Sequence, residues 1–126
     1  MSRQRMLAFG AIGILLATGS LSAHHRWPVD QSTLVTVQGT VVSYSWGNPH
    51  VMIVLDVATD DGRVERWNVG GPSTSRMGAN GWDRNTLQGG EMITGMGFQF
   101  SDGSQVVRLE KIVMADGSEM LLYGRS

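Results

Sequence analysis

Apolar and polar residues alternate along several short stretches of this chain, and this pattern limits its fold more than any other feature. The stretch 50–58 is the clearest case, with Val51, Ile53 and Leu55 all on one side. A period of two residues is typical of a β-strand with one buried face. Turn sequences such as Asp60-Asp61-Gly62 separate these stretches. The sequence therefore predicts strands over residues 34–46, 50–58, 63–69, 91–100, 105–114 and 119–123.

A short helix is expected between the third and fourth strands, because Ser73 or Thr74 can cap a helix that runs to about Ala79. Three strands, a helix and then more strands is the order of an OB-type barrel, in which the helix covers one end. A shift in the apolar phase of the first strand also indicates a β-bulge at Gly39. We therefore expect a mainly all-β fold, a small OB-like barrel of five to six strands with one short helix. A small two-sheet sandwich is the alternative. The bends that closure requires are expected at three glycines, Gly39, Gly95 and Gly97.

Residues 1–23 have the order of a secretory signal peptide. Arg3 and Arg5 precede the uncharged apolar run 6–17, and small residues follow at 20–23. A basic start, a short apolar helix and small residues are the features that a signal peptidase recognises, and the run is short for a membrane span. An uncleaved N-terminal anchor is the alternative. The sequence therefore predicts export to the periplasm.

Cleavage after Ala23 would leave a single domain, 24–126, of 103 residues, in which 24–32 form an N-terminal arm. This part carries 8 basic and 11 acidic residues, a net charge of −3. An acidic domain without a basic run is not expected to bind nucleic acid or, after signal cleavage, an anionic membrane. The chain has no cysteine, so core packing must hold the domain together without disulfides.

Histidines at the predicted mature N-terminus are the main chemical signal. The chain has three, and these are the candidate metal ligands: His24, His25 and His50. If the cut follows Ala23, the amine and ring of His24 can chelate one metal ion and His50 can add a third nitrogen, a histidine brace. If it follows Ser22, a free amine with histidine at position three can enclose copper(II) or nickel(II) in a square plane. Nitrogen-rich sites favour copper and nickel, and zinc is possible with a carboxylate such as Asp30.

A simpler interpretation stays open for each of these histidines. His24 and His25 are then polar residues after a cleavage site, and His50 hydrogen-bonds the turn formed by Asn48 and Pro49.

Two tryptophans in loop-like segments, Trp27 and Trp82, are the candidate ligand-binding residues. They can form a stacking surface for a sugar or a peptide, as faces of such barrels often do. The alternative is that they cover the barrel ends. The methionines of the domain, which include Met52, are expected mainly in the core, because methionine fills irregular gaps.

Sequence motifs of common enzyme classes are missing. The chain contains no Gly-x-Ser-x-Gly, no His-Glu-x-x-His and no phosphate loop. We therefore expect a binding protein with no catalytic residues, although a copper-loaded histidine brace can support oxidative chemistry.

Several motifs together resemble a family of small exported bacterial proteins known only as a domain of unknown function. The resemblance covers nearly all of the expected mature chain and rests on Ala23-His24-His25, Gly39-Thr40-Val41, Trp46-Gly47-Asn48-Pro49-His50, Gly81-Trp82 and Leu87-x-x-Gly90-Glu91. The chain departs from the family at Arg26-Trp27, where a Ser-Phe pair is usual. The resemblance implies export and a single small domain. The sequence thus favours an exported periplasmic binding protein that takes copper through its N-terminal histidines. The alternative is a non-catalytic OB-like module that binds an envelope ligand or protein.

Overall fold

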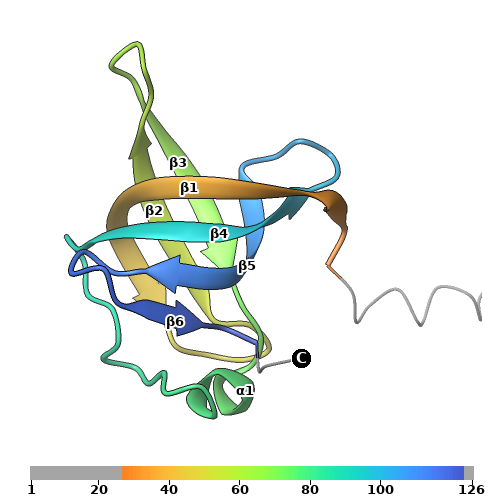
Figure 1. Cartoon of the computed structure of the whole chain (residues 1–126), viewed down its shortest axis with the longest axis vertical. Coiled ribbons are helices and arrows are strands. Elements are labelled where there is room, and N and C mark those ends of the chain that lie inside the picture. The colour runs from red at the N-terminus through yellow and green to blue at the C-terminus, as the bar shows by residue number, and fades with distance from the viewer. Residues whose placement is uncertain (1–26, 124–126) are drawn as a thin grey trace, which may run out of the picture.

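Six strands and one short helix make up the part of the chain that the computed structural model describes, residues 27–123. The elements follow the predicted order (Figure 1). They are β1 (Val29–Ser45), β2 (Met52–Ala58), β3 (Val64–Gly70), α1 (Thr74–Gly78), β4 (Met92–Phe100), β5 (Val106–Val113) and β6 (Glu119–Leu121).

The strands close into an OB-type barrel, which confirms the predicted fold class. The sheet order is β3-β2-β1-β4-β5-β6, and β3 also pairs with β5. This additional pairing is parallel and short, joining Asn68, Val69 and Gly70 to Val106, Val107 and Arg108. The other pairings are antiparallel. The β3–β5 contact turns one sheet into a barrel, so the sandwich alternative is wrong.

The buried face of each strand is the one that the period-two pattern selects. Val51, Ile53 and Leu55 are fully buried, as the alternation of residues 50–58 requires. On β4 the buried positions include Ile93, Gly95 and Gly97. The complete core consists of Val37, Val41, Val51, Ile53, Leu55, Val69, Met77, Trp82, Leu87, Ile93, Val107, Leu109, Ile112 and Leu122.

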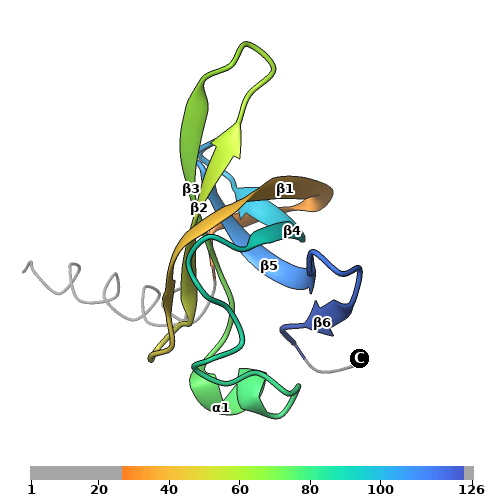
Figure 2. The same ribbon diagram turned by 90° about the vertical axis from the view of Figure 1, so that its left-hand side faces the viewer.

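Helix α1 covers one end of the barrel, at the opposite end from the β2–β3 turn (Figures 1 and 2). Ser73 caps it as predicted, since its side chain accepts a hydrogen bond from the Arg76 amide. Met77 is the buried residue of the helix, and it packs close to Gly71. Helix α1 therefore closes the base of the core and fixes the chain on either side of it.

Two local predictions for the first strand are wrong. Strand β1 begins at Val29, so residues 29–32 belong to the sheet and not to an arm. The bulge lies at Val42, because the β1–β2 register shifts between Val41 and Ser43 while the β1–β4 register runs evenly through Gly39. Gly39 instead permits close approach of β2, since a Cβ there would lie 2.6 Å from the Asp56 carbonyl oxygen.

No helix within residues 27–123 is long and apolar enough to cross a membrane.

Candidate functional site

His50 lies in the loop between β1 and β2, at the end of the barrel that α1 covers. The predicted second strand included His50, but β2 begins at Met52, so that boundary is wrong. The side chain of His50 is exposed. His24 and His25, the other two predicted metal ligands, lie outside the described residues, as does the predicted signal segment.

Backbone hydrogen bonds fix the loop that carries His50. The Val51 amide donates to the Pro72 carbonyl over 3.0 Å, and the Gly71 amide donates to the Val51 carbonyl over 2.9 Å. In the same loop, the side-chain oxygen of Asn48 accepts two hydrogen bonds from Thr74. The Thr74 amide donates one at 3.0 Å and the Thr74 hydroxyl donates the other at 3.2 Å. The loop is therefore joined to the first residue of α1, and His50 has a defined place beside it.

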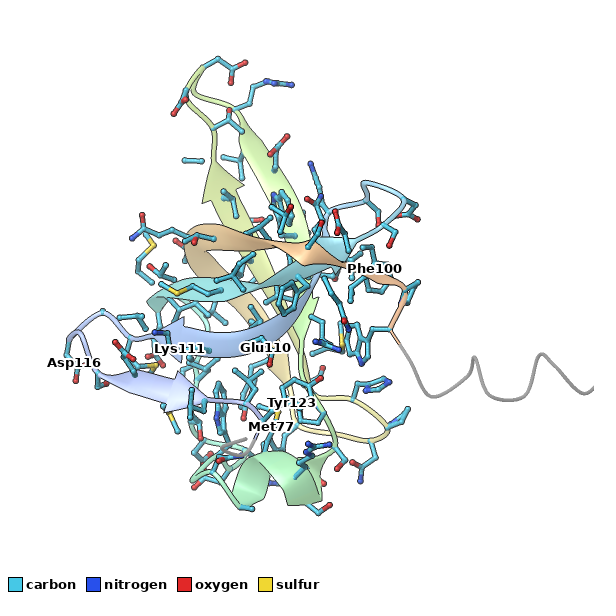
Figure 3. The ribbon with its side chains drawn as sticks, turned by 45° about the vertical axis from the view of Figure 1, so that its right-hand side comes forward. Met77, Phe100, Glu110, Lys111, Asp116 and Tyr123 are labelled. Atoms are coloured by element: carbon cyan, nitrogen blue, oxygen red, sulfur yellow. The ribbon has the colours of Figure 1, made fainter. Side chains whose placement is uncertain are left out.

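Trp27 packs directly against His50. The two ring centroids are 4.7 Å apart with the planes at 61°, an edge-on contact. Trp27 also meets Phe100 at the end of β4, with centroids 5.8 Å apart (Figure 3 labels Phe100). The chain reaches this place because Val29 pairs with Phe100, and the Ser101 amide donates to the Pro28 carbonyl over 2.8 Å. Trp27, the first residue that the structure describes, is thus in contact with His50.

A pocket of about 710 Å³ opens between these rings and helix α1. Its lining includes the Trp27–His50 pair and a second group in which Arg76 and Arg108 both contact Tyr123. Further lining comes from Gln31, Pro49, Pro72 and Ser73. The pocket therefore joins the start of β1, the β1–β2 loop, α1, β5 and the end of the described chain.

Tyr123 contacts both arginines of the pocket. The guanidinium carbon of Arg76 is 5.1 Å from the centroid of its ring, and that of Arg108 is 5.5 Å from the same centroid. Figure 3 shows Tyr123 between β5, which carries Glu110, and α1, which carries Met77. Burial raises the pKa of the Tyr123 phenol, and the neighbouring positive charge of Arg108 opposes that shift. Tyr123 therefore stays neutral at physiological pH and presents its ring to both cations.

Arg108 is held from several directions. Its guanidinium carbon also lies 5.5 Å from the centroid of Phe98, which is its partner across the β4–β5 ladder. One Nη donates to Glu110 Oε1 over 2.8 Å, and the arginine side chain is only 19% exposed. Between Phe98, Tyr123 and Glu110 the guanidinium has little freedom to move, so its position in the pocket is set by the folded barrel.

The described residues do not by themselves form a metal site. Within residues 27–123, no group of three or more histidine or acidic side chains is placed to hold a metal ion. Asp30, the expected carboxylate for a zinc site, is exposed and accepts bonds from the Ser32 amide and hydroxyl. These hydrogen bonds lower the pKa of Asp30.

Trp82 takes no part in the pocket. It is 3% exposed, and its indole N–H donates to the Leu121 carbonyl over 2.8 Å. The ring covers the core at the barrel end, so it offers no free face against which a ligand can stack. Of the two predicted stacking residues, only Trp27 lies on the pocket.

Sequence reasoning did not identify Arg76, Arg108 or Tyr123 as site residues. A usable signal exists for one of them. Arg108 lies between Val107 and Leu109, so alternation places it on the outer face of β5 together with Glu110. No comparable pattern marks the other two, because closure of the barrel brings them to Arg108.

A family model and a number of solved structures, two of which follow, are similar to this chain. The model of a family described as "Family of unknown function (DUF6152)" matches residues 13–108. The mitochondrial single-stranded DNA-binding protein Rim1 of S. cerevisiae has a TM-score of 0.47 and 10% identity, covering 73% of this chain and 97% of its own. A ZRD-deleted mutant of TiaS in complex with agmatine has a TM-score of 0.47 and 18% identity, covering 76% of this chain and 26% of its own. No curated protein matches the chain.

Proposed function

Since the chain belongs to DUF6152, a family of unknown function, we propose its role from its own site: it is an exported, periplasmic binding protein that holds copper at its N-terminus. The ligands are His24, His25 and His50, and the free amine created by signal cleavage completes the set. This proposal joins the sequence signal for export to the position of the one histidine in the described part of the chain.

The contact between Trp27 and His50 carries the proposal. Their ring centroids are 4.7 Å apart, so the N-terminal chain is at His50 by residue 27. An extended chain spans at most about 3.6 Å per residue. His25 and His24 are two and three residues before Trp27, so their Cα atoms cannot be more than about 7 and 11 Å from that of Trp27. Chain length therefore allows both imidazoles to reach the β1–β2 loop.

The chemistry depends on which bond the signal peptidase cuts. Cleavage after Ala23 makes His24 the first residue, and its amine and ring nitrogen chelate one ion while His50 supplies a third nitrogen. Cleavage after Ser22 gives Ala23-His24-His25, in which the amine and the histidine at position three favour square-planar copper(II). Both sets contain nitrogen donors, for which copper(II) has the highest affinity among divalent first-row metals.

Copper(II) titration of the processed protein tests this proposal. The intact mass of the secreted chain first identifies the residue that carries the free amine. A form whose N-terminal amine is acetylated should then bind copper(II) far more weakly, because in both ligand sets the free amine is one of the donors. Equal affinity of the two forms would reject the free-amine site.

The contribution of His50 needs its own variant. His50→Ala should lower copper(II) affinity and remove one nitrogen from the electron paramagnetic resonance spectrum. Gln38→Ala, on the exposed part of β1, is the control and should change neither. If His50→Ala leaves both unchanged, copper is bound by the N-terminal residues without the loop.

The alternative function, a non-catalytic module for an envelope ligand or protein, is supported by the position of Trp27. This residue is half-buried and lines the pocket. Such a module should change its tryptophan fluorescence when it binds cell-wall fragments, and Trp27→Phe should remove that change. It should also bind copper(II) no better than an unstructured peptide, which separates the two functions.

A further inference from the structure

We propose that the pocket beside α1 binds a small organic anion, with its carboxylate or phosphate group at Arg76 and Arg108 and its ring against Trp27. This proposal does not depend on copper, because it rests on Arg76, Arg108 and Trp27 and not on the histidines. The proposed ligand, an organic anion, belongs to a class that the histidines do not indicate.

The part of the pocket formed by Arg76 and Arg108, its cationic wall, carries a net positive charge. None of the described residues that line the pocket is acidic. Glu110 lies next to the pocket and neutralises Arg108 at 2.8 Å. Within residues 27–123, Arg76 has no carboxylate within ion-pair distance. Two arginines against one glutamate leave a net positive charge, so this wall attracts an anion.

Arg108 also has hydrogen-bonding capacity to spare. A guanidinium has five N–H donors, and within the described chain Glu110 takes one of them. The Nε atom is buried and has no partner among residues 27–123. Arginine held against aromatic rings presents a fixed, planar set of donors, which suits the two oxygens of a carboxylate or phosphate. Arg76 also contacts the Tyr123 ring, and both arginines line the same pocket.

The rest of the pocket indicates a molecule larger than a bare ion. Its volume of about 710 Å³ is within the usual range for small-molecule sites. Trp27 forms one side, and the apolar rings of Pro49 and Pro72 contribute to the lining. A flat ring can pack on these groups while its acidic substituent reaches the arginines. The ligand class is therefore a ring-bearing acid, such as an acidic sugar, a sugar phosphate or an aromatic acid.

Titration with matched charged and uncharged probes tests this inference by nuclear magnetic resonance. The probes are glucuronate and benzoate for a carboxylate, glucose 6-phosphate for a phosphate on a ring, and inorganic phosphate for the anion alone. Glucose and benzamide are their uncharged counterparts. The indole N–H of Trp27 and the Nε–H of Arg76 report binding in metal-free protein. At least one ring-bearing anion should shift both signals in a saturable way, and the probe that binds most tightly identifies the acidic group.

Arg76→Gln is the decisive variant, because Arg76 is exposed on α1 and its loss should not unfold the barrel. It should weaken binding of the best anion by about tenfold or more, as expected for loss of a charge-assisted contact. The control is Arg63→Gln, which makes the same charge change at the β2–β3 turn, far from α1 (Figure 1).

Three results would overturn the inference. The first is that none of the anions shifts the Trp27 and Arg76 signals at millimolar concentration. The second is that glucose or benzamide binds as well as its charged counterpart, which would make the pocket an apolar site. The third is that Arg76→Gln and Arg63→Gln weaken binding equally, which would make the attraction a property of overall charge.

Discussion

Replacing Gly97 by alanine tests whether the close approach of β4 and β5 both closes the barrel and sets the position of Arg108. A Cβ atom at residue 97 would lie 2.1 Å from the Arg108 carbonyl oxygen and 2.8 Å from the Leu109 Cα. The ladder between the strands is irregular between Met96 and Gly97. Gly97 is therefore the point at which the backbone of β4 lies directly against the residue that enters the pocket.

The expected loss of stability follows from the kind of atoms in the way. Real Cβ contacts below 3.0 Å are essentially never observed, and the obstructing atoms here are backbone and cannot rotate aside. Overpacking a close-packed interior costs about 1–3 kcal/mol and sometimes more. We therefore expect Gly97→Ala to lower the free energy of unfolding by about 3 kcal/mol. In a domain of this size each 1 kcal/mol shifts the melting temperature by about 4–8 °C, so melting should fall by about 12 °C or more.

Urea and thermal denaturation followed by circular dichroism measure this loss. Gly78→Ala is the control, since a Cβ at the last residue of α1 meets nothing within 4 Å and alanine favours a helix. Gly95→Ala should fall between the two, because its nearest obstacle, at 2.7 Å, is the end of the Leu109 side chain. If Gly97→Ala proves as stable as Gly78→Ala, the two strands are not packed as closely as described here, and the argument for a fixed Arg108 fails.

Three further changes test the core, the surface and the phenols. Trp82→Phe should destabilise the domain by about 1–3 kcal/mol in urea, because the Leu121 carbonyl loses its indole donor; an unchanged midpoint would contradict this. Asp56→Asn should cost less than about 1 kcal/mol, since its partner Arg66 is 61% exposed; a larger loss would show that the pair is not solvated. Burial raises the pKa of Tyr44 to about 12, so the folded state retains a proton that the unfolded state releases near pH 10. The stability that this gives is complete below pH 10 and is lost as the pH rises through about 12. Ultraviolet absorbance should therefore show little tyrosinate in folded protein at pH 10, and full ionisation there would refute the burial of Tyr44.

The strands were predictable because each one buries a single face. A period-two pattern identifies the buried residues of β2 and the ends of most strands to within a residue or two, independently of what they pack against. The predicted bulge at Gly39 is wrong because this glycine has a different role in the sheet. Gly39 is required by the neighbouring strand, where a side chain would meet the Asp56 carbonyl, whereas the extra residue is Val42. The sequence pattern shows that the apolar phase of a strand changes, but it does not show which neighbouring strand requires a glycine.

The pocket was less predictable than the fold because its cationic wall exists only in the closed barrel. Arg76 comes from α1, Arg108 from β5 and Tyr123 from the residues after β6. β5 pairs with β3, which leads into α1, and with β6, which leads to Tyr123, so the three residues come together only in the folded barrel. Trp82 shows the same limit, since its loop-like sequence allows either a stacking surface or a cover for the barrel end, and the fold buries it to 3% exposure in the second role. Local pattern gives the face of a strand, but only tertiary pairing determines which loops share a pocket.

Copper and the organic anion, if both bind, must influence each other. His50 and the two arginines line the same pocket of about 710 Å³, so a copper ion at His50 would add positive charge to that pocket. A cation bound in the same pocket strengthens the attraction for an anion. Binding free energies are linked, so the anion must raise copper affinity by the same factor as copper raises anion affinity. We expect that factor to exceed one and to fall with salt. Measuring both affinities, each with and without the second ligand, gives the factor twice. A factor of one in both directions would mean that the metal and the anion occupy separate sites.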